Sequence, residues 1–138
     1  MELEGYELPD ELYYTEDHTW ARVEDDGTVT VGMDQFGATS VGEIEFLDLP
    51  MEDDEFEAGD AFGSVESAKW VGGLMMPVTG RVIEVNEEVE DDPEIMADDP
   101  YGDGWLIKVD PDDLDNDLKK LYHGDSVKDW FIEDIKSR

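Results

Sequence analysis

Short stretches in which apolar and polar residues alternate recur along the first 110 positions, separated by turn-forming residues. The clearest is residues 28–31, which follow Asp25-Asp26-Gly27 and alternate polar threonine with apolar, β-branched valine. This pattern predicts a strand entered from a turn, with residues 20–23 as its hairpin partner. Other β-prone stretches bounded by turns predict four further strands, at residues 43–47, 61–65, 80–85 and 105–109.

Helical spacing appears in two parts of the chain. Residues 33–39 are compatible with a short helix, and Asp34 is placed to cap it. After Pro111, apolar residues recur at helical intervals in two sets on either side of Gly124: Leu114, Leu118 and Leu121, then Val127, Phe131 and Ile135. These sets predict two short C-terminal helices.

The many short strands predict a mainly β fold, a flattened barrel or sandwich with short peripheral and C-terminal helices. No strand–helix–strand spacing indicates a parallel sheet. The length of 138 residues suits one domain. We expect an N-terminal extension over residues 1–11, a β domain over residues 12–111, and a helical tail over residues 112–138 that packs on the domain.

Acidic residues dominate the composition, with 40 Asp and Glu against nine Lys and Arg and a formal charge of -31. Such a surface repels nucleic-acid phosphates and anionic lipid head groups, so neither nucleic acid nor membrane is expected as a partner. The acidity reflects either attraction of a basic partner or adaptation to a salty cell. Because the acids are scattered through every segment, we favour a halophilic protein and expect its melting temperature to fall when salt is removed.

Several classes of chemistry are excluded by the composition. The chain has no cysteine, hence no disulfide, thiolate metal site or cysteine nucleophile. His18 and His123 are its only histidines, too few for a metal site with ordinary ligands. No nucleophile–base pair is visible, no apolar run approaches the ~18 residues of a membrane span, and the N-terminus does not read as a signal peptide. We expect a cytoplasmic protein without catalytic residues or a metal.

Basic residues are unevenly placed, and the first 118 positions contain only four: Arg22, Lys69, Arg81 and Lys108. Lys69 lies between the strand ending near Val65 and the run at residues 72–77, where a β-turn would present it to solvent. The residues alone leave three alternatives for Lys69: a solvated turn residue, a Schiff-base nucleophile, or the attachment point of a cofactor. A nucleophile needs a lowered pKa, whereas abundant carboxylates hold the ammonium charged.

Three segments around Lys69 form a recognisable pattern: Glu66-Ser67-Ala68-Lys69, Pro77-Val78-Thr79-Gly80 and Val82-Ile83-Glu84-Val85-Asn86. Further motifs on both sides extend it: Asp17-His18-Thr19-Trp20, Gly27-Thr28-Val29-Thr30-Val31-Gly32, Gly42-Glu43-Ile44, Asp92-Pro93-Glu94 and Asp99-Pro100-Tyr101-Gly102-Asp103-Gly104-Trp105-Leu106. Together they span about residues 12–121. This pattern resembles the H proteins of the glycine cleavage system.

The resemblance implies a lipoyl-domain-like fold and a non-catalytic carrier function. It implies that lipoic acid is joined by an amide to Lys69, and that this arm carries an aminomethyl group and electrons between glycine decarboxylase, aminomethyltransferase and dihydrolipoyl dehydrogenase. It also implies that a lipoate ligase or lipoyl transferase recognises Glu66 and Gly80. The alternative is that neither residue is recognised, so that Glu66 is one acidic residue among many and Gly80 only a turn residue. His18 matches a family pattern and is expected to be structural or to line the cavity where a loaded arm rests.

The residues directly after Lys69 depart from the family pattern. Trp70-Val71-Gly72 places an indole where small residues are usual, and this segment resembles the lipoate-binding proteins of heterodisulfide-reductase-like sulfur-oxidising systems. A sulfur carrier with the same lysine is therefore an alternative, as are a relay that passes on lipoyl groups and an unmodified acidic binding module. Trp70 either anchors a partner or packs on Met75 or Met76 across the hairpin.

Overall fold

The computed structural model describes residues 1–40 and 42–137. Its six-stranded sheet consists of β3 (Tyr13–Tyr14), β4 (Thr19–Val23), β5 (Val29–Met33), β11 (Ile107–Pro111), β10 (Gly80–Val85) and β7 (Glu55–Phe56), in that spatial order. Its three-stranded sheet consists of β6 (Ile44–Asp48), β8 (Ala61–Ser67) and β9 (Val71–Met75). A separate hairpin is formed by β1 (Glu2–Leu3) and β2 (Tyr6–Glu7).

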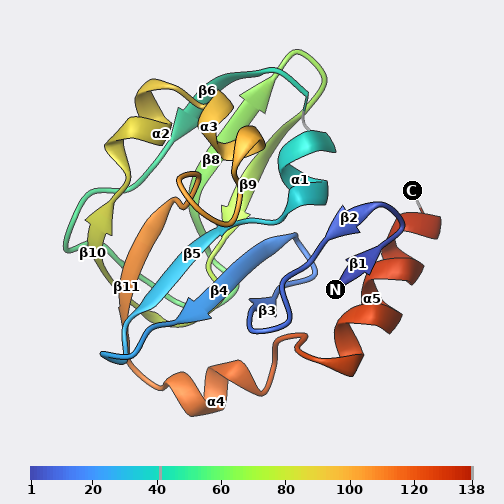
Figure 1. Cartoon of the computed structure of the whole chain (residues 1–138). Helices are drawn as coiled ribbons and strands as arrows, with labels where there is room; N and C mark the ends of the chain where they lie inside the picture. Colours follow the sequence, from blue (N-terminus) through green and yellow to red (C-terminus); the bar gives the residue numbers. More distant parts are fainter. Residues whose placement is uncertain (41, 138) are drawn as a thin grey trace.

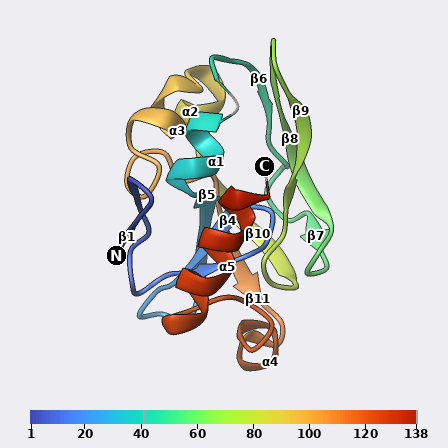
Figure 2. The same ribbon diagram turned by 90° about the vertical axis from the view of Figure 1, so that its right-hand side faces the viewer.

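The two larger sheets lie face to face and do not close into a barrel, so the sandwich is the correct one of the two predicted architectures (Figure 1). Figure 2 shows the three-stranded sheet as a separate layer, whose outer side carries no helix in the described part of the chain. The helices are α1 (Gln35–Ser40), α2 (Glu87–Asp91), α3 (Glu94–Asp98), α4 (Leu114–Leu118) and α5 (Asp125–Lys136). None of the described helices is long and apolar enough to cross a membrane.

The predicted elements are mostly present. The predicted hairpin is β4–β5, with Val23 opposite Val29. Helix α1 follows β5, and Asp34 caps it as predicted, because its Oδ1 accepts the N–H of Gly37 at 2.8 Å. The strand predicted at residues 105–109 is offset, since β11 begins two residues later and ends at Pro111. Helices α2 and α3 were not predicted, because each is a single acidic segment with one buried residue and no repeating apolar spacing.

The core divides into two clusters. The main cluster lies between the two sheets and is apolar throughout, with Val31, Val65, Leu74 and Val109 fully buried. The terminal cluster joins both ends of the chain to β3 and β4, and its buried members are Leu3, Leu8, Leu12, Tyr14, Trp20, Val127 and Phe131. Residues 1–11, expected as an extension, thus contribute to a core that includes α5, and the β1–β2 hairpin lies beside this helix (Figure 1).

Candidate functional site

Lys69 lies at the tip of the β8–β9 hairpin (Figure 1). The Ser67 N–H donates to the Trp70 carbonyl at 2.8 Å, which closes the loop. The buried Ser67 hydroxyl accepts the N–H groups of Lys69 at 3.3 Å and Trp70 at 3.1 Å. This turn therefore holds the backbone of Lys69 in place while its side chain is exposed, as the sequence predicted.

The side chain of Lys69 extends past Gly42 in the segment before β6. A Cβ on Gly42 would lie 3.4 Å from Lys69 Cδ and 3.8 Å from Nζ, and the φ of Gly42 is +78°, in the left-handed region that favours glycine. Among the described residues, no carboxylate forms a salt bridge with Lys69. The amine of Lys69 is therefore exposed to solvent and, among the described residues, is not paired with a carboxylate although the protein is acidic.

The two residues expected to mark Lys69 for modification lie in different environments. Glu66 is exposed on β8, three positions before Lys69 and on the same hairpin. Gly80 is buried at the start of β10 in the other sheet, where a Cβ would lie 2.5 Å from the Asp110 carbonyl oxygen and 2.6 Å from Val109 Cγ1. Close packing of β10 on β11 thus requires glycine at position 80. Only Glu66 of these two lies beside Lys69.

A cavity of about 330 Å³, here called the hairpin cavity, opens between the β8–β9 hairpin and α1. Its lining comes from both predicted residues and new ones: Asp17, His18, Met33, Phe36, Gly37, Ser40, Trp70, Gly73 and Met75. His18 and Trp70 therefore line one cavity, and Trp70 directly follows Lys69 in the sequence. Its volume is in the range of small-ligand sites.

Trp70 folds back along the hairpin. Its ring occupies the space above Gly72, where a Cβ would lie 2.3 Å from the indole Cη2. The side chain is 40% exposed, so it packs partly on the hairpin and is partly open to solvent. Met75 lines the same cavity as Trp70, while Met76 is buried in the main cluster.

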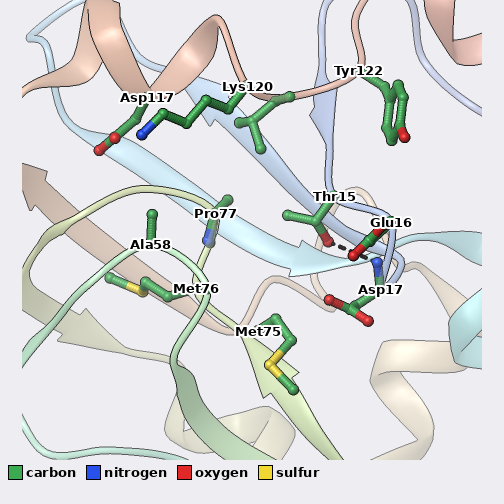
Figure 3. A pocket seen from close by; sticks show the side chains of 12 residues that line it. Thr15, Glu16, Asp17, Ala58, Met75, Met76, Pro77, Asp117, Lys120 and Tyr122 are labelled. Atoms are coloured by element: carbon green, nitrogen blue, oxygen red, sulfur yellow. Dashed lines mark hydrogen bonds between the residues drawn. The ribbon is translucent and has the colours of Figure 1, made fainter.

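A second cavity of about 350 Å³ adjoins the first and shares Asp17 and Met75 with it. Figure 3 shows Thr15, Glu16 and Asp17 on one side of it and Asp117 and Lys120 on the other. The Asp17 N–H donates to Thr15 Oγ1 at 3.2 Å. No group of three His, Asp or Glu side chains in the described ranges is placed to hold a metal ion.

His18 is a buried connection between three elements. Its Nδ1 lies 2.8 Å from Asp34 Oδ2, beside α1, and its Nε2 lies 2.7 Å from Asp134 Oδ2, on α5. The backbone of His18 has a φ of +70°, which is uncommon for a residue other than glycine. Both side-chain bonds and the surrounding chain thus hold His18 in one position.

The surroundings of His18 favour its protonated form. Burial alone would lower the pKa of His18, but hydrogen bonds and charges from Asp34 and Asp134 outweigh burial and raise this pKa above the ordinary 6.5. Burial also raises the pKa of Asp34, while the bonds from His18 and the Gly37 N–H oppose that rise. We place the shared proton on the imidazole, because a ring that faces two carboxylates is best satisfied with both nitrogens donating.

Sequence reasoning missed three contributors to this region. Asp34 was identified only as a helix cap, Asp134 was not singled out, and Ser67 was noted only as part of a motif. The signal that could have identified Ser67 is local, since a serine two and three positions before the N–H groups of a turn can accept both. No local signal links His18 to Asp134, because they are 116 positions apart.

A β-sandwich that presents one uncommitted lysine on a hairpin tip, beside a cavity, has the architecture of a carrier domain. The chain belongs to the glycine cleavage H-protein family, because the family model "Glycine cleavage H-protein" matches residues 12–134. This membership confirms the resemblance found in the sequence.

Individual relatives agree with the family assignment. A probable glycine cleavage system H protein of Thermococcus gammatolerans is 41% identical over 131 residues, which cover 95% of this chain and 97% of that protein. The glycine cleavage system H protein of Halalkalibacterium halodurans is 43% identical over 127 residues, covering 92% and 98%. The crystal structure of a glycine cleavage system H protein from Mycobacterium marinum matches with a TM-score of 0.72 at 38% identity, over 75% of this chain and 86% of that one. The predicted fold class is thereby confirmed as well.

Proposed function

We propose that the protein is the lipoyl-bearing carrier of a glycine cleavage system, with lipoic acid joined by an amide to Lys69 Nζ. The observation that carries this proposal is the exposed, uncommitted Lys69 on a rigid hairpin, in a chain that belongs to the H-protein family. The bound dithiolane supplies acceptor and redox chemistry that the side chains lack. The partners are glycine decarboxylase, which loads an aminomethyl group, aminomethyltransferase, which removes it, and dihydrolipoyl dehydrogenase, which reoxidises the dithiol.

The hairpin cavity suits a loaded arm in its resting position. Trp70 and Met75 form an apolar wall for the carbon chain, and the Asp17 carboxylate lies in the lining, where it can attract a cationic amine. His18 contributes only the surface of its ring, because both ring nitrogens already bond to carboxylates. In this proposal His18 fixes the wall of the cavity and does not bind the arm.

A lipoate ligase or lipoyl transferase attaches the arm, and Glu66 is the residue it contacts beside Lys69. Gly80 acts through the fold, because its lack of a side chain keeps β10 close to β11. The 40 acidic residues against nine basic ones support a protein that works in a salt-rich cytoplasm.

The test is the intact mass of protein purified from its native host, with peptide mapping, for the wild type, Lys69→Arg and Lys108→Arg. Lys108 is the matched control, since it is the other lysine of the β body. We expect a lipoyl increment on Lys69, lost in Lys69→Arg and retained in Lys108→Arg, and glycine-dependent loading of the modified protein. An unmodified Lys69 in cells that lipoylate other proteins would favour the binding module, and sulfur loading without glycine-dependent loading would favour the sulfur carrier.

A further inference from the structure

Gly42, just before β6, lies beside the side chain of Lys69. Ile44, the first residue of β6, pairs with Ser67, the last residue of β8. Gly42 and Lys69 lie two positions beyond this pair on either side, so the antiparallel ladder brings them face to face. The distances agree, because a Cβ on Gly42 would lie 3.4 Å from Cδ, 3.7 Å from Cε and 3.8 Å from Nζ of Lys69. The outer half of the lysine stem thus lies on the backbone of Gly42.

Gly42 differs from every other described glycine with a positive φ. Its own φ is +78°, and its N–H donates to the Thr39 carbonyl at 3.3 Å, which ties it to the C-terminal end of α1. The other four have no neighbouring atom within 4 Å of the place where a Cβ would stand: Gly5, Gly27, Gly59 and Gly124. A turn therefore explains glycine at those four positions. At Gly42 the missing side chain also leaves space for another group, and that group is the stem of Lys69.

The contact with Gly42 orients the stem of Lys69. Within residues 1–40 and 42–137, the Lys69 ammonium forms no salt bridge and no hydrogen bond that would hold it elsewhere. Lysine stems are apolar and flexible, and they lie along a protein surface while the charged end stays in water. The bare backbone of Gly42 is such a surface.

This contact lies at one end of the hairpin cavity. Ser40 and Trp70 both line that cavity, two positions before Gly42 and one position after Lys69. The stem that crosses Gly42 therefore ends near the rim formed by α1 and the hairpin. A group joined to Nζ begins its path at this rim.

We propose that Gly42 is a positioning residue for the lipoyl arm, an inference that rests on the proposed function. The bare backbone of Gly42 directs the stem of Lys69 to the rim of the hairpin cavity, where the attached arm enters. Acylation removes the positive charge of Nζ, so hydration no longer draws the end of the stem away from the protein. Gly42 thereby sets the balance between an arm at rest in the cavity and a free arm that partner enzymes reach. A side chain at position 42 competes with the stem for the same space and shifts the balance toward the free arm.

The experiment compares Gly42→Asn with Gly27→Asn after full lipoylation by a lipoate ligase, checked by intact mass, and reduction of the arm. Asn tolerates the left-handed region, and Gly27 has a φ of +87° with open space around it, so the change of backbone is matched. The chain has no cysteine, so the thiols of the arm are the only ones that iodoacetamide can alkylate. Only the free arm reacts, hence the rate follows its population. We expect alkylation to be about threefold faster or more in Gly42→Asn, and unchanged in Gly27→Asn.

Dihydrolipoyl dehydrogenase provides a readout that a merely structural role of Gly42 would not move. Because the enzyme binds the free arm, its KM for Gly42→Asn should fall by the same factor as the alkylation rate rises, while kcat stays unchanged. Gly42→Ala carries a smaller side chain and should lie between the wild type and Gly42→Asn in both measurements. The melting temperatures of Gly42→Asn and Gly27→Asn should change alike.

The outcomes separate this inference from the function on which it rests. Alkylation of Gly42→Asn at the rate of Gly27→Asn, or more slowly, would overturn the positioning role and leave the carrier function in place. The same holds for a KM that does not differ between the two Asn variants. A wild-type chain that accepts no lipoyl group would overturn the proposed function and this inference together.

Discussion

The two hydrophobic clusters of the protein differ in what lies inside them. The buried members of the main cluster are all apolar, and they fill the space between two sheets. The terminal cluster surrounds a charged group, because the rings of Phe36, Trp130 and Phe131 lie 4.8, 5.1 and 6.0 Å from the His18 ring. The burial of apolar side chains stabilises the main cluster. The terminal cluster depends in addition on the protonated imidazole of His18, which is held between two carboxylates.

This difference matters because the hairpin cavity lies where the clusters meet. Met33 belongs to the main cluster, while Phe36 packs against the terminal cluster, and both line the cavity. The main cluster thus supports the sheet that carries Lys69. The terminal cluster fixes α5 and the wall of the hairpin cavity that faces the hairpin. The two clusters should respond differently to mutation and to pH.

The largest effect is expected for His18→Ala. This change leaves Asp34 buried without its imidazolium partner, and breaking such a pair costs about 3–5 kcal/mol in free energy of unfolding. Adding Asp34→Asn should recover part of the loss, because the uncompensated charge is then removed. Denaturant unfolding in molar salt measures both. A double variant no more stable than His18→Ala would contradict the charge argument.

A smaller effect is expected from pH. The pKa of His18 is raised in the folded state above its unfolded value near 6.5, so the stabilisation is complete below that pH and is lost as pH rises through the folded pKa. The free energy of unfolding should therefore decline as pH rises from about 6.5 through the raised pKa of His18, and His18→Gln should remove this decline. Leu74→Ala in the main cluster should cost about 2–5 kcal/mol and keep the wild-type slope. If the free energy of unfolding depended on pH in His18→Gln as it does in the wild type, the group that titrates would be a residue other than His18.

The smallest effect on stability is expected at the boundary between the clusters, for Trp70→Ala. Because Trp70 is 40% exposed, its removal should change the free energy of unfolding by only about 0.5 kcal/mol. Lipoylation should stay largely intact, since the ring lies over Gly72 and the side chain of Lys69 is exposed. Transfer of the loaded group to partner enzymes should slow several-fold. Normal partner kinetics would leave Trp70 a packing residue only.

The sequence was informative where structure is local. The β4–β5 hairpin, the Asp34 cap and the turn around Lys69 each depend on residues within a few positions, so their patterns were readable. The choice of sandwich over barrel depends on how distant strands meet. The bonds of His18 join residues 16 and 116 positions apart, and the position of Phe46 opposite Glu66 appears only once the strand register is known. No spacing in the chain could reveal these.

The turn held by Ser67 has a consequence for any group attached to Lys69. Because one hydroxyl oxygen accepts two backbone N–H groups, the base of the tether is fixed, and its freedom lies in the bonds of the side chain and the attached group. A tether with a fixed base and limited length keeps its end at a high effective concentration around the docked partner. The rigidity of the loop at residues 68–70 would thus determine how often the carried group meets each enzyme.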